Sequence, residues 1–368
     1  MIYCFIGTKA QLIKMAPVMR ELRQRHIPFR YLDSGQHAAI TRELRRLFEL
    51  PEPDVCLRDR TQDITSTREA IRWYLRLLWK SRTDRAWLRR EVFPDDGVCL
   101  IHGDTLSTLL GLQMARRAGL KVAHVEAGLR SFHWFDPFPE ELIRIFCMKR
   151  ADLLFAPSAE AETNLRAMRL PGQIIRVAGN TVADALRWMG STARSRIAPT
   201  TPFALATCHR LETLTSRRRL SRVVDLLNRV AATWPLVFVV HGPTRRYLRQ
   251  FGLEARLNPA MIVKDLLDYG EFIALLSAAQ FVLSDGGSIQ EECAYLDKPC
   301  LILRNQTERN DGLDRHALLW RFDDQIAEHF LRNVVQRASL TPQEWPQPSA
   351  QMVESLASWT QEPVGRKS

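Results

Sequence analysis

Short apolar runs recur along the chain, and most of them are apolar at nearly every position. Continuous apolarity is typical of parallel strands buried on both faces, whereas a strand with one face in water alternates. Segments with helical spacing separate the runs, so the pattern predicts right-handed βαβ units and doubly wound parallel sheets of the α/β class. The predicted strands are Tyr3–Ile6, Phe29–Leu32, Val98–His102, Val122–Glu126, Leu153–Ala156, Ile174–Val177, Phe203–Thr207, Val237–His241, Met261–Val263, Phe281–Leu283 and Cys300–Leu303.

The length of 368 residues suggests two domains. The pattern breaks at Thr192–Pro202, which has two prolines and no periodicity. We therefore predict two Rossmann-like domains, residues 1–191 and 203–345, and a C-terminal segment, 346–368, whose helix packs back on the first domain. Ligands of such sheets bind beyond the carboxyl ends of the strands, and two sheets facing each other would form one deep cleft.

Composition excludes several classes of protein. Hydrophobic residues make up 46% of the chain and charged residues 25%, which is usual for a globular protein. No apolar run reaches the roughly 18 residues of a membrane-spanning helix, and the first residues lack the features of a signal peptide. The seven cysteines are scattered and form no Cys-x-x-Cys pair. We expect reduced thiols, no disulfide or zinc, and a cytoplasmic location.

The formal net charge of +11 favours an anionic ligand. No nucleic-acid-binding module is recognisable, so we expect no nucleic-acid partner. The segment Ile71–Arg90 is basic and aromatic, and Arg72, Arg76 and Lys80 share one helical face opposite an apolar stripe. We interpret it as a helix in the core or at a subunit contact, with a solvated basic rim. The alternative is a helix on a membrane surface, giving a weak peripheral association.

Polar residues gather where the predicted strands end, which is where an open α/β sheet binds its ligand. The segment Asp285–Glu292 predicts a strand end, a Gly-Gly turn and a helix start, where Gly286, Gly287 and Ser288 would face phosphate oxygens. Glu292, one turn into that helix, could accept ribose hydroxyls. The alternatives are an ordinary turn with Ser288 as N-cap, and a surface position for Glu292.

Asp104, Glu126 and Glu140 follow the strands of the first half and predict an acid/base site. A reaction that removes a proton from one side of a carbon and returns one to the other side needs two such groups. Asp104 alone could instead cap a turn. A metal site is a further alternative, because His102 and His124 each precede a carboxylate by two residues. We favour hydrogen-bonded core histidines and predict no metal.

Taken together, these motifs resemble those of the non-hydrolysing UDP-N-acetylglucosamine 2-epimerases. The resemblance spans most of the chain, and the set of HVEAGLR, PFPEE and a DGG loop followed by QEE is highly specific. The matching segments are GTKAQLIKMAP (7–17), SGQH (34–37), HGDT (102–105), HVEAGLRS (124–131), PFPEELIR (137–144), AGNTVADAL (178–186), CHRLE (208–212), SDGGSIQEE (284–292) and QTER (306–309).

The resemblance implies two Rossmann-like domains arranged as in GT-B glycosyltransferases and a homodimer through the first domain. It implies interconversion of UDP-GlcNAc and UDP-ManNAc without an added cofactor, for cell-surface polysaccharide synthesis. The chemistry would be elimination of UDP to a 2-acetamidoglucal, followed by re-addition of UDP with inversion at carbon 2.

The resemblance also assigns roles to residues. Asp104, Glu126 and Glu140 match the catalytic carboxylates, and Glu292 matches the ribose ligand. Gln36 and His37 match the motif at which some members bind a second, activating UDP-GlcNAc. The cationic groups expected around the pyrophosphate and sugar are Lys14, Arg144 and His209, and we count His209 among the catalytic groups. We add to the predicted substrate-binding set Lys9, His241, Gly286, Gly287, Ser288 and Arg309.

Several positions depart from the family pattern. Lys9-Ala10-Gln11 stands where the family usually has Arg-Pro-Glu, and lysine lacks the forked donor of arginine. Asp285-Gly286-Gly287-Ser288 replaces Asp-Ser-Gly-Gly, and Asn310-Asp311 ends a motif that usually continues as Pro-Glu. The sugar-side carboxylates are unchanged, so we expect acid/base chemistry on a UDP-2-acetamido sugar. A hydrolysing 2-epimerase, a GT-B glycosyltransferase and a non-catalytic nucleotide-sugar sensor are the alternatives.

Overall fold

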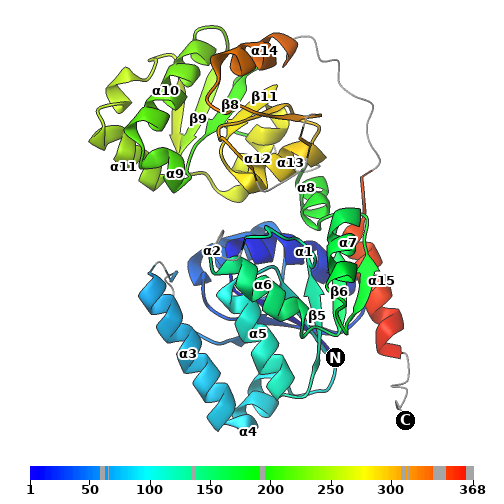
Figure 1. The fold of residues 1–368 in the computed structure, drawn as a ribbon. Helices are drawn as coiled ribbons and strands as arrows, with labels where there is room; N and C mark the ends of the chain where they lie inside the picture. The colour runs from blue at the N-terminus through cyan, green and yellow to red at the C-terminus, as the bar shows by residue number, and fades with distance from the viewer. Residues whose placement is uncertain are drawn as a thin grey trace. The chain divides into compact units, whose positions relative to one another are not determined.

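The computed structural model describes residues 1–58, 63–64, 66–133, 138–190, 195–307, 312–313, 315–334 and 345–361. The chain divides into two compact units, Met1–Ala185 with Pro346–Ser368, and Leu186–Trp345. This division falls a few residues before the hinge expected from the sequence, and it lies inside helix α8 (Val182–Gly190). Figure 1 shows the helices and strands of each unit.

The first unit is built on a seven-stranded sheet whose order is β3-β2-β1-β4-β5-β6-β7. Every pairing in it is parallel. All residues of the central strands β1 and β4 are buried, as their continuous apolarity predicts. The strands are β1 (Ile2–Ile6), β2 (Phe29–Asp33), β3 (Val55–Cys56), β4 (Val98–His102), β5 (Lys121–Val125), β6 (Leu153–Ala156) and β7 (Gln173–Arg176).

Helices cover this sheet, and one core cluster joins alternate residues of its strands, such as Tyr3, Phe5 and Ile101, to α3, α5 and α6. Helix α1 packs against α2 and α15. Helix α15, although last in the chain, therefore belongs to the first unit. The helices are α1 (Lys9–Gln24), α2 (Ala38–Leu47), α3 (Thr67–Thr83), α4 (Arg85–Trp87), the π-helical turn η1 (Leu88–Val92), α5 (Leu106–Arg117), α6 (Glu140–Met148), α7 (Ala159–Ala167), α8 and α15 (Pro348–Gln361).

The second unit repeats this plan with six strands in the order β10-β9-β8-β11-β12-β13, again all parallel. The strands are β8 (Ala204–Thr207), β9 (Leu236–Val240), β10 (Ile262–Asp265), β11 (Phe281–Ser284), β12 (Cys300–Ile302) and β13 (Ala317–Leu319). The helices are α9 (Leu211–Leu214), α10 (Arg217–Ala231), α11 (Gly242–Gln250), the short η2 (Glu254–Arg256), α12 (Tyr269–Ala278), α13 (Gly287–Tyr295) and α14 (Asp324–Val334).

Both sheets confirm the predicted doubly wound α/β class. In each of them the strand order reverses beside the first strand: between β1 and β4 in the first unit, and between β8 and β11 in the second. Loops leaving the carboxyl ends of two such strands run in opposite directions and leave a crevice between them. This point is where a ligand of each sheet is expected.

The basic segment Ile71–Arg90, predicted as one helix, is divided in the structure between α3 and the turns that follow it. Helix α3 ends at Thr83, because Asp84 adopts a non-helical backbone and its side chain caps the next turn. Trp73 and Leu77 face the core, but a second apolar stripe on α3 is exposed. Among the described residues, no helix is both long and apolar enough to cross a bilayer.

Candidate active site

The two loops at the crevice of the first sheet are tied together by one buried amide. The side-chain oxygen of Gln11 accepts from the backbone N–H of Gly7, at 2.9 Å, and its nitrogen donates to the backbone oxygen of His102, at 2.8 Å. Gly7 must be glycine, because a Cβ there would lie 2.0 Å from Oγ of Ser107. The β1–α1 loop and the β4–α5 loop therefore hold a fixed spacing at this edge of the sheet.

Glu126 directly follows β5 and turns its carboxylate toward these loops. Its backbone is left-handed, with φ of 63°, a conformation that costs a non-glycine residue roughly 1–3 kcal/mol. Lys14 of α1 and Asn180 both donate to its Oε1. Nε2 of His102 lies 3.5 Å from its Oε2. Such strain persists only where the surroundings impose it, and here three separate segments converge on one carboxylate.

Asp104, at the end of the β4 loop, pairs with Arg144 of α6. Arg144 is also held by Glu141, whose Oε2 lies 2.8 Å from Nη1 of the guanidinium. Burial raises the pKa of Asp104 above its usual range, although the charge of Arg144 opposes the shift and that of Glu126 adds to it. Asp104 therefore holds its proton more readily than an exposed aspartate does.

The sequence left two alternatives for this region, and the structure decides against a capping role for Asp104. The N-cap of α5 is Thr105, whose side chain accepts from the backbone N–H of Thr108. His102 and His124 are core histidines, and Nε2 of His124 lies 2.7 Å from the backbone oxygen of Gly103. Burial lowers the pKa of both histidines to about 4. Among the described residues, no three His, Cys, Asp or Glu side chains are placed to share a metal ion.

Glu140 is the first residue of α6 and is half-buried. Its Oε2 is buried and has no hydrogen-bond partner within the described parts of the chain. A buried carboxylate oxygen without a donor is costly unless a ligand or water supplies one. Glu140 is thus set apart from the paired carboxylates Asp104 and Glu126.

Lys9, Gln36 and His37 lie together at the β1 side of the same crevice. The backbone N–H of Lys9 donates to Nδ1 of His37, at 3.3 Å, and Oε1 of Gln36 accepts from Oγ of Ser107, at 2.6 Å. Burial lowers the pKa of His37. The two residues predicted for a second ligand therefore touch the loops that carry the predicted substrate-binding residues.

In the second unit, Asp285 organises the crevice between β8 and β11. Its fully buried carboxylate accepts from the backbone N–H groups of His209 and Arg210 at 2.9 Å each. The ring of His209 stacks on that of His241, with centroids 4.7 Å apart and planes 10° from parallel. Burial lowers the pKa of His209, and the charge of Asp285 opposes this shift.

Helix α13 begins in this crevice, and two alternatives for it, Ser288 as N-cap and a surface position for Glu292, are wrong. The N-cap is Gly286 and not Ser288, which is exposed at the second helical position after Gly287. Gly286 has no side chain that could cap the first N–H groups of the helix, and an anion-binding helix start leaves such groups available. Glu292 is not a surface acid: it is 5% exposed and accepts from the hydroxyl of Tyr269, at 3.0 Å.

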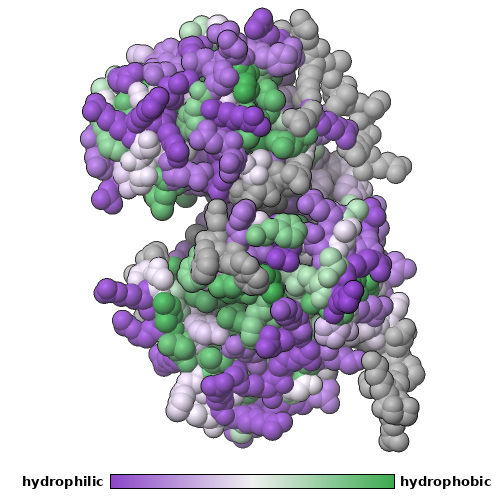
Figure 2. Space-filling model, in the orientation of Figure 1, coloured by the Kyte–Doolittle hydropathy of each residue, from purple (hydrophilic) through white to green (hydrophobic). Residues whose placement is uncertain are grey.

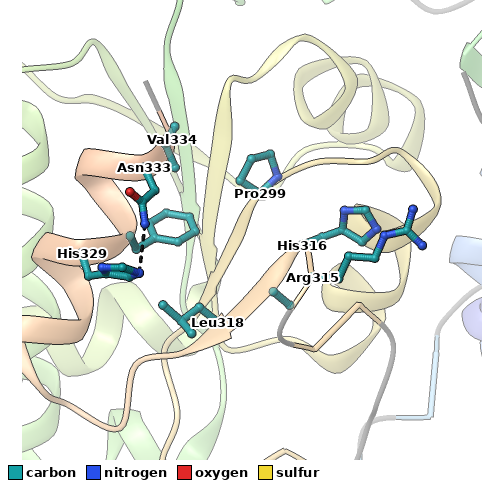
Figure 3. A pocket seen from close by; sticks show the side chains of 9 residues that line it. Pro299, Arg315, His316, Leu318, His329, Asn333 and Val334 are labelled. Carbon is teal, nitrogen blue, oxygen red and sulfur yellow. Dashed lines mark hydrogen bonds between the residues drawn. The ribbon is translucent and has the colours of Figure 1, made fainter. Parts of the chain in front are cut away.

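One predicted residue and one cavity of the second unit remain to be placed. Arg309, predicted to bind substrate, lies outside the described residues. A cavity of about 230 Å³ between β13 and α14 is lined by residues including Pro299, His316 and His329 (Figure 3). Pro299 precedes β12, so this cavity opens at the amino end of that strand, and it contains none of the predicted site residues.

Four residues that complete the site were not singled out from the sequence. Asn180, Glu141 and Arg130 occur inside the segments AGNTVADAL, PFPEELIR and HVEAGLRS, so the matching motifs contained a signal for them. Tyr269 lies outside every matching segment. Its contact with Glu292 joins α12 to α13 and could not be read from spacing along the chain.

Comparisons with known proteins agree with this architecture. A family described as UDP-N-acetylglucosamine 2-epimerase matches residues 20–336. The UDP-N-acetylglucosamine 2-epimerase of Yersinia pestis is 32% identical over 336 residues, covering 85% of this chain and 84% of that protein. The UDP-2,3-diacetamido-2,3-dideoxy-D-glucuronate 2-epimerase of Pseudomonas aeruginosa is 36% identical over 215 residues, covering 57% and 59%. The solved UDP-GlcNAc 2-epimerase from Methanocaldococcus jannaschii aligns with a TM-score of 0.80 at 25% identity, covering 97% of this chain and 99% of that one.

Proposed function

Because the chain belongs to the UDP-N-acetylglucosamine 2-epimerase family, we propose that it interconverts UDP-GlcNAc and UDP-ManNAc, or a closely related UDP-2-acetamido sugar. It is an enzyme of the isomerase class that acts on carbohydrates. The product would supply an activated 2-acetamido sugar for cell-surface polysaccharide synthesis. A hydrolysing or glycosyl-transferring activity is not favoured by these relatives.

The observation that carries this proposal is the contrast between two carboxylates in one crevice. Glu126 accepts from Lys14 and Asn180, contacts that stabilise a charged carboxylate. Burial raises the pKa of Asp104, which favours its protonated form. Two neighbouring carboxyl groups whose environments differ in this way suit one base and one acid. Glu140, with an unpartnered buried oxygen, is a third group that a ligand could engage.

The proposed reaction needs such a pair because the proton on carbon 2 is not acidic. No carbonyl is adjacent to that carbon, so removal of the proton must accompany departure of UDP from carbon 1. The base takes the proton as the C1–O bond breaks, and the ring becomes a 2-acetamidoglucal. Return of UDP to carbon 1 and of a proton to the opposite face of carbon 2 gives the epimer. The leaving pyrophosphate needs positive charge or N–H donors around it.

The second unit is suited to the nucleotide. The N-terminus of α13, with Gly286 and Gly287 and no capping side chain, offers N–H groups and the positive end of a helix dipole. His209 and His241 lie beside it as potential donors. Glu292 is buried one turn further on and matches the acid that accepts ribose hydroxyls. Gln36 and His37, in the first unit, are the proposed contacts for a second UDP-sugar.

A second substrate deserves a test of its own, the UDP-2,3-diacetamido uronic acid class. The Pseudomonas aeruginosa relative named for that substrate is 36% identical over 215 residues. The departures at Lys9, in the first unit, and in the Gly286-Gly287-Ser288 turn, in the second, leave the three carboxylates unchanged. Either substrate would undergo the same proton exchange at carbon 2.

Incubation with UDP-GlcNAc in heavy water, followed by proton NMR, tests the proposal. If a carboxylate removes the proton and exchanges it with solvent, both UDP-ManNAc and recovered UDP-GlcNAc will carry deuterium at carbon 2. Free ManNAc would identify a hydrolysing enzyme. Free GlcNAc that keeps its carbon 2 proton would indicate a transferase without acceptor, and line broadening alone would indicate a sensor. Retention of that proton in both substrate classes would refute epimerisation.

The exposed stripe on α3 supports a second proposal, a homodimer through the first unit. Ile71, Leu75 and Trp79 are 49%, 54% and 69% exposed and follow one another at i, i+4 spacing. Figure 2 shows apolar side chains along α3 next to hydrophilic ones. Trp79 of this stripe also lines an open groove of about 910 Å³, together with Arg72 and Arg76. A row of apolar residues of this kind marks an interaction surface, and a two-fold contact would bury it twice.

Sedimentation of the Leu75→Glu variant would test the dimer. We expect the wild type to sediment as a dimer and Leu75→Glu as a monomer, because two glutamates would be buried per contact. Leu211→Glu is the matched control: Leu211 is 64% exposed in the second unit, and its variant should remain dimeric. A monomeric wild type would refute the dimer. If that monomer binds anionic vesicles through α3, the basic face with Arg72, Arg76 and Lys80 belongs to a membrane-binding surface.

A further inference from the structure

Glu141 is a buried carboxylate that accepts three hydrogen bonds in the first unit's crevice, and the proposed acid/base chemistry does not use it. It is 1% exposed. Nε of Arg130 donates to its Oε1 at 2.5 Å, the backbone N–H of Ser131 donates to its Oε2 at 3.2 Å, and Nη1 of Arg144 donates to its Oε2 at 2.8 Å. It thereby joins the loop after β5 to helix α6.

The Arg144 guanidinium is shared between two carboxylates. Nη1 faces Glu141 on the same helix, and Nη2 faces Asp104 from the β4 loop. The other ionisable groups whose charge acts on Asp104 are Glu126 and Lys14, and the thiol of Cys147 lies close enough for Asp104 to raise its pKa. His124 feels the charge of both Arg144 and Glu126 but is buried in its neutral form.

On the basis of the proposed epimerase function, we propose that Glu141 is a positioning residue that divides the Arg144 guanidinium with Asp104. Glu141 binds Nη1 of the Arg144 guanidinium, so Asp104 contacts only Nη2. Asp104 is therefore paired with a cation that another carboxylate already partly neutralises. Arg130 and the N–H of Ser131 fix Glu141 in turn, which sets the direction of the guanidinium plane.

This division matters for the reaction because Asp104 must be able to hold a proton. An unshared arginine beside a carboxylate strongly favours its ionised form. Burial raises the pKa of Asp104 above its usual range although the charge of Arg144 opposes the shift. Because Glu141 holds the other edge of the same guanidinium, it limits this opposition. Loss of the Glu141 charge should therefore make Asp104 a stronger acid, without removing Arg144 from the site.

Carbon-13 NMR of the aspartate carboxyls in the full-length protein gives a direct test. In Glu141→Gln, we expect the titration midpoint of Asp104 to fall by about one pH unit. In Arg144→Gln it should rise instead, because the opposing cation is gone. Glu162→Gln is the matched control, since Glu162 also accepts from an arginine, Arg166, on a helix of the same unit, and should leave the midpoint unchanged. A midpoint that stays or rises in Glu141→Gln would overturn the proposal.

Turnover provides a second measurement. We expect Glu141→Gln to lower kcat by about 10–100-fold near neutral pH with little change in KM, and to move the pH limb that belongs to Asp104 in the same direction as the NMR midpoint. If Glu141→Gln does not fold, the double variant Glu141→Gln/Arg130→Gln also removes the arginine that loses its carboxylate partner. The titration midpoint of Asp104 should still fall in this double variant. A wild-type protein that epimerises neither substrate class would refute the proposed function, but the NMR titration would still test Glu141.

Discussion

Alanine at position 286 would test whether His209 acts from the place where the structure holds it. A Cβ on residue 286 would lie 2.8 Å from Cε1 of His209, closer than carbon atoms approach one another. The backbone of His209 cannot retreat, because its N–H donates to the buried carboxylate of Asp285. The imidazole must therefore rotate, and its stacking on His241 is lost.

The size of the effect follows from this displacement. The ring has to move by roughly 1 Å to restore ordinary contact, and a misplacement of that size costs a reacting group about 10²-fold in rate. We expect kcat of Gly286→Ala to fall by about 10²-fold in the epimerisation assay. The helix start keeps its N–H groups, so affinity for UDP, measured by calorimetry, should change by less than about threefold.

Two further variants isolate the cause. Gly242→Ala is the matched control: Gly242 also begins a helix directly after His241, and a Cβ there meets no atom within 4 Å. It should keep wild-type turnover. In a His209→Asn background, Gly286→Ala should add little, because both changes act on the same ring. A full 10²-fold loss in that background would show that the methyl group acts elsewhere, and our reasoning would be wrong.

Further predictions concern the carboxylates, the nucleotide and pH. Amide variants of the three proposed catalytic carboxylates should each lower turnover by about 10²–10⁴-fold with UDP affinity nearly unchanged, and normal turnover in all three would contradict the mechanism; they are Asp104→Asn, Glu126→Gln and Glu140→Gln. Glu292→Ala should weaken UDP binding by about 1–3 kcal/mol in calorimetry, and unchanged affinity would place the nucleotide elsewhere. Burial lowers the pKa of His102 and His124 to about 4, so the unfolded chain takes up protons first as pH falls. The free energy of unfolding from urea titrations should drop between about pH 6.5 and 4, by at most roughly 3 kcal/mol per histidine, and a flat profile would count against their burial.

The central strands could be predicted from sequence because their signal is local. The runs Val98–His102 and Leu153–Ala156 have the same bounds as β4 and β6. The edge strands β3 and β13 escaped prediction. They are two and three residues long and only partly buried, and they are strands chiefly because they pair with β2 and β12. Such a pairing depends on a distant neighbour and leaves almost no pattern in the residues themselves.

The same limit applies to the site. Strand ends identify where polar groups collect, so Asp104 and Glu126 could be placed at one edge of the sheet. The pairing of each carboxylate with a particular cation could not be predicted, since Lys14 is 112 positions from Glu126 and Arg144 is 40 positions from Asp104. Those contacts depend on β4 lying between β1 and β5, a strand order that periodicity does not specify.

Helix α3 shows a related ambiguity. Its sequence carries two apolar stripes, one with Trp73 and Leu77 and one with Leu75 and Trp79. Both have helical spacing, so hydropathy alone cannot tell which one faces the core. Packing against α5 buries the first stripe and leaves the second exposed.

The return of α15 to the first unit has a consequence for how the protein is made. Its residues Met352, Val353 and Leu356 are at most 1% exposed, and the backbone N–H of Ser349 donates to Asp184 at 2.8 Å. Because α15 follows the second unit along the chain, a ribosome must synthesise that whole unit before the first can close its core. The surface of α1 that α15 covers stays open during this interval, so the nascent first unit is exposed to chaperones and proteases for longer than the second.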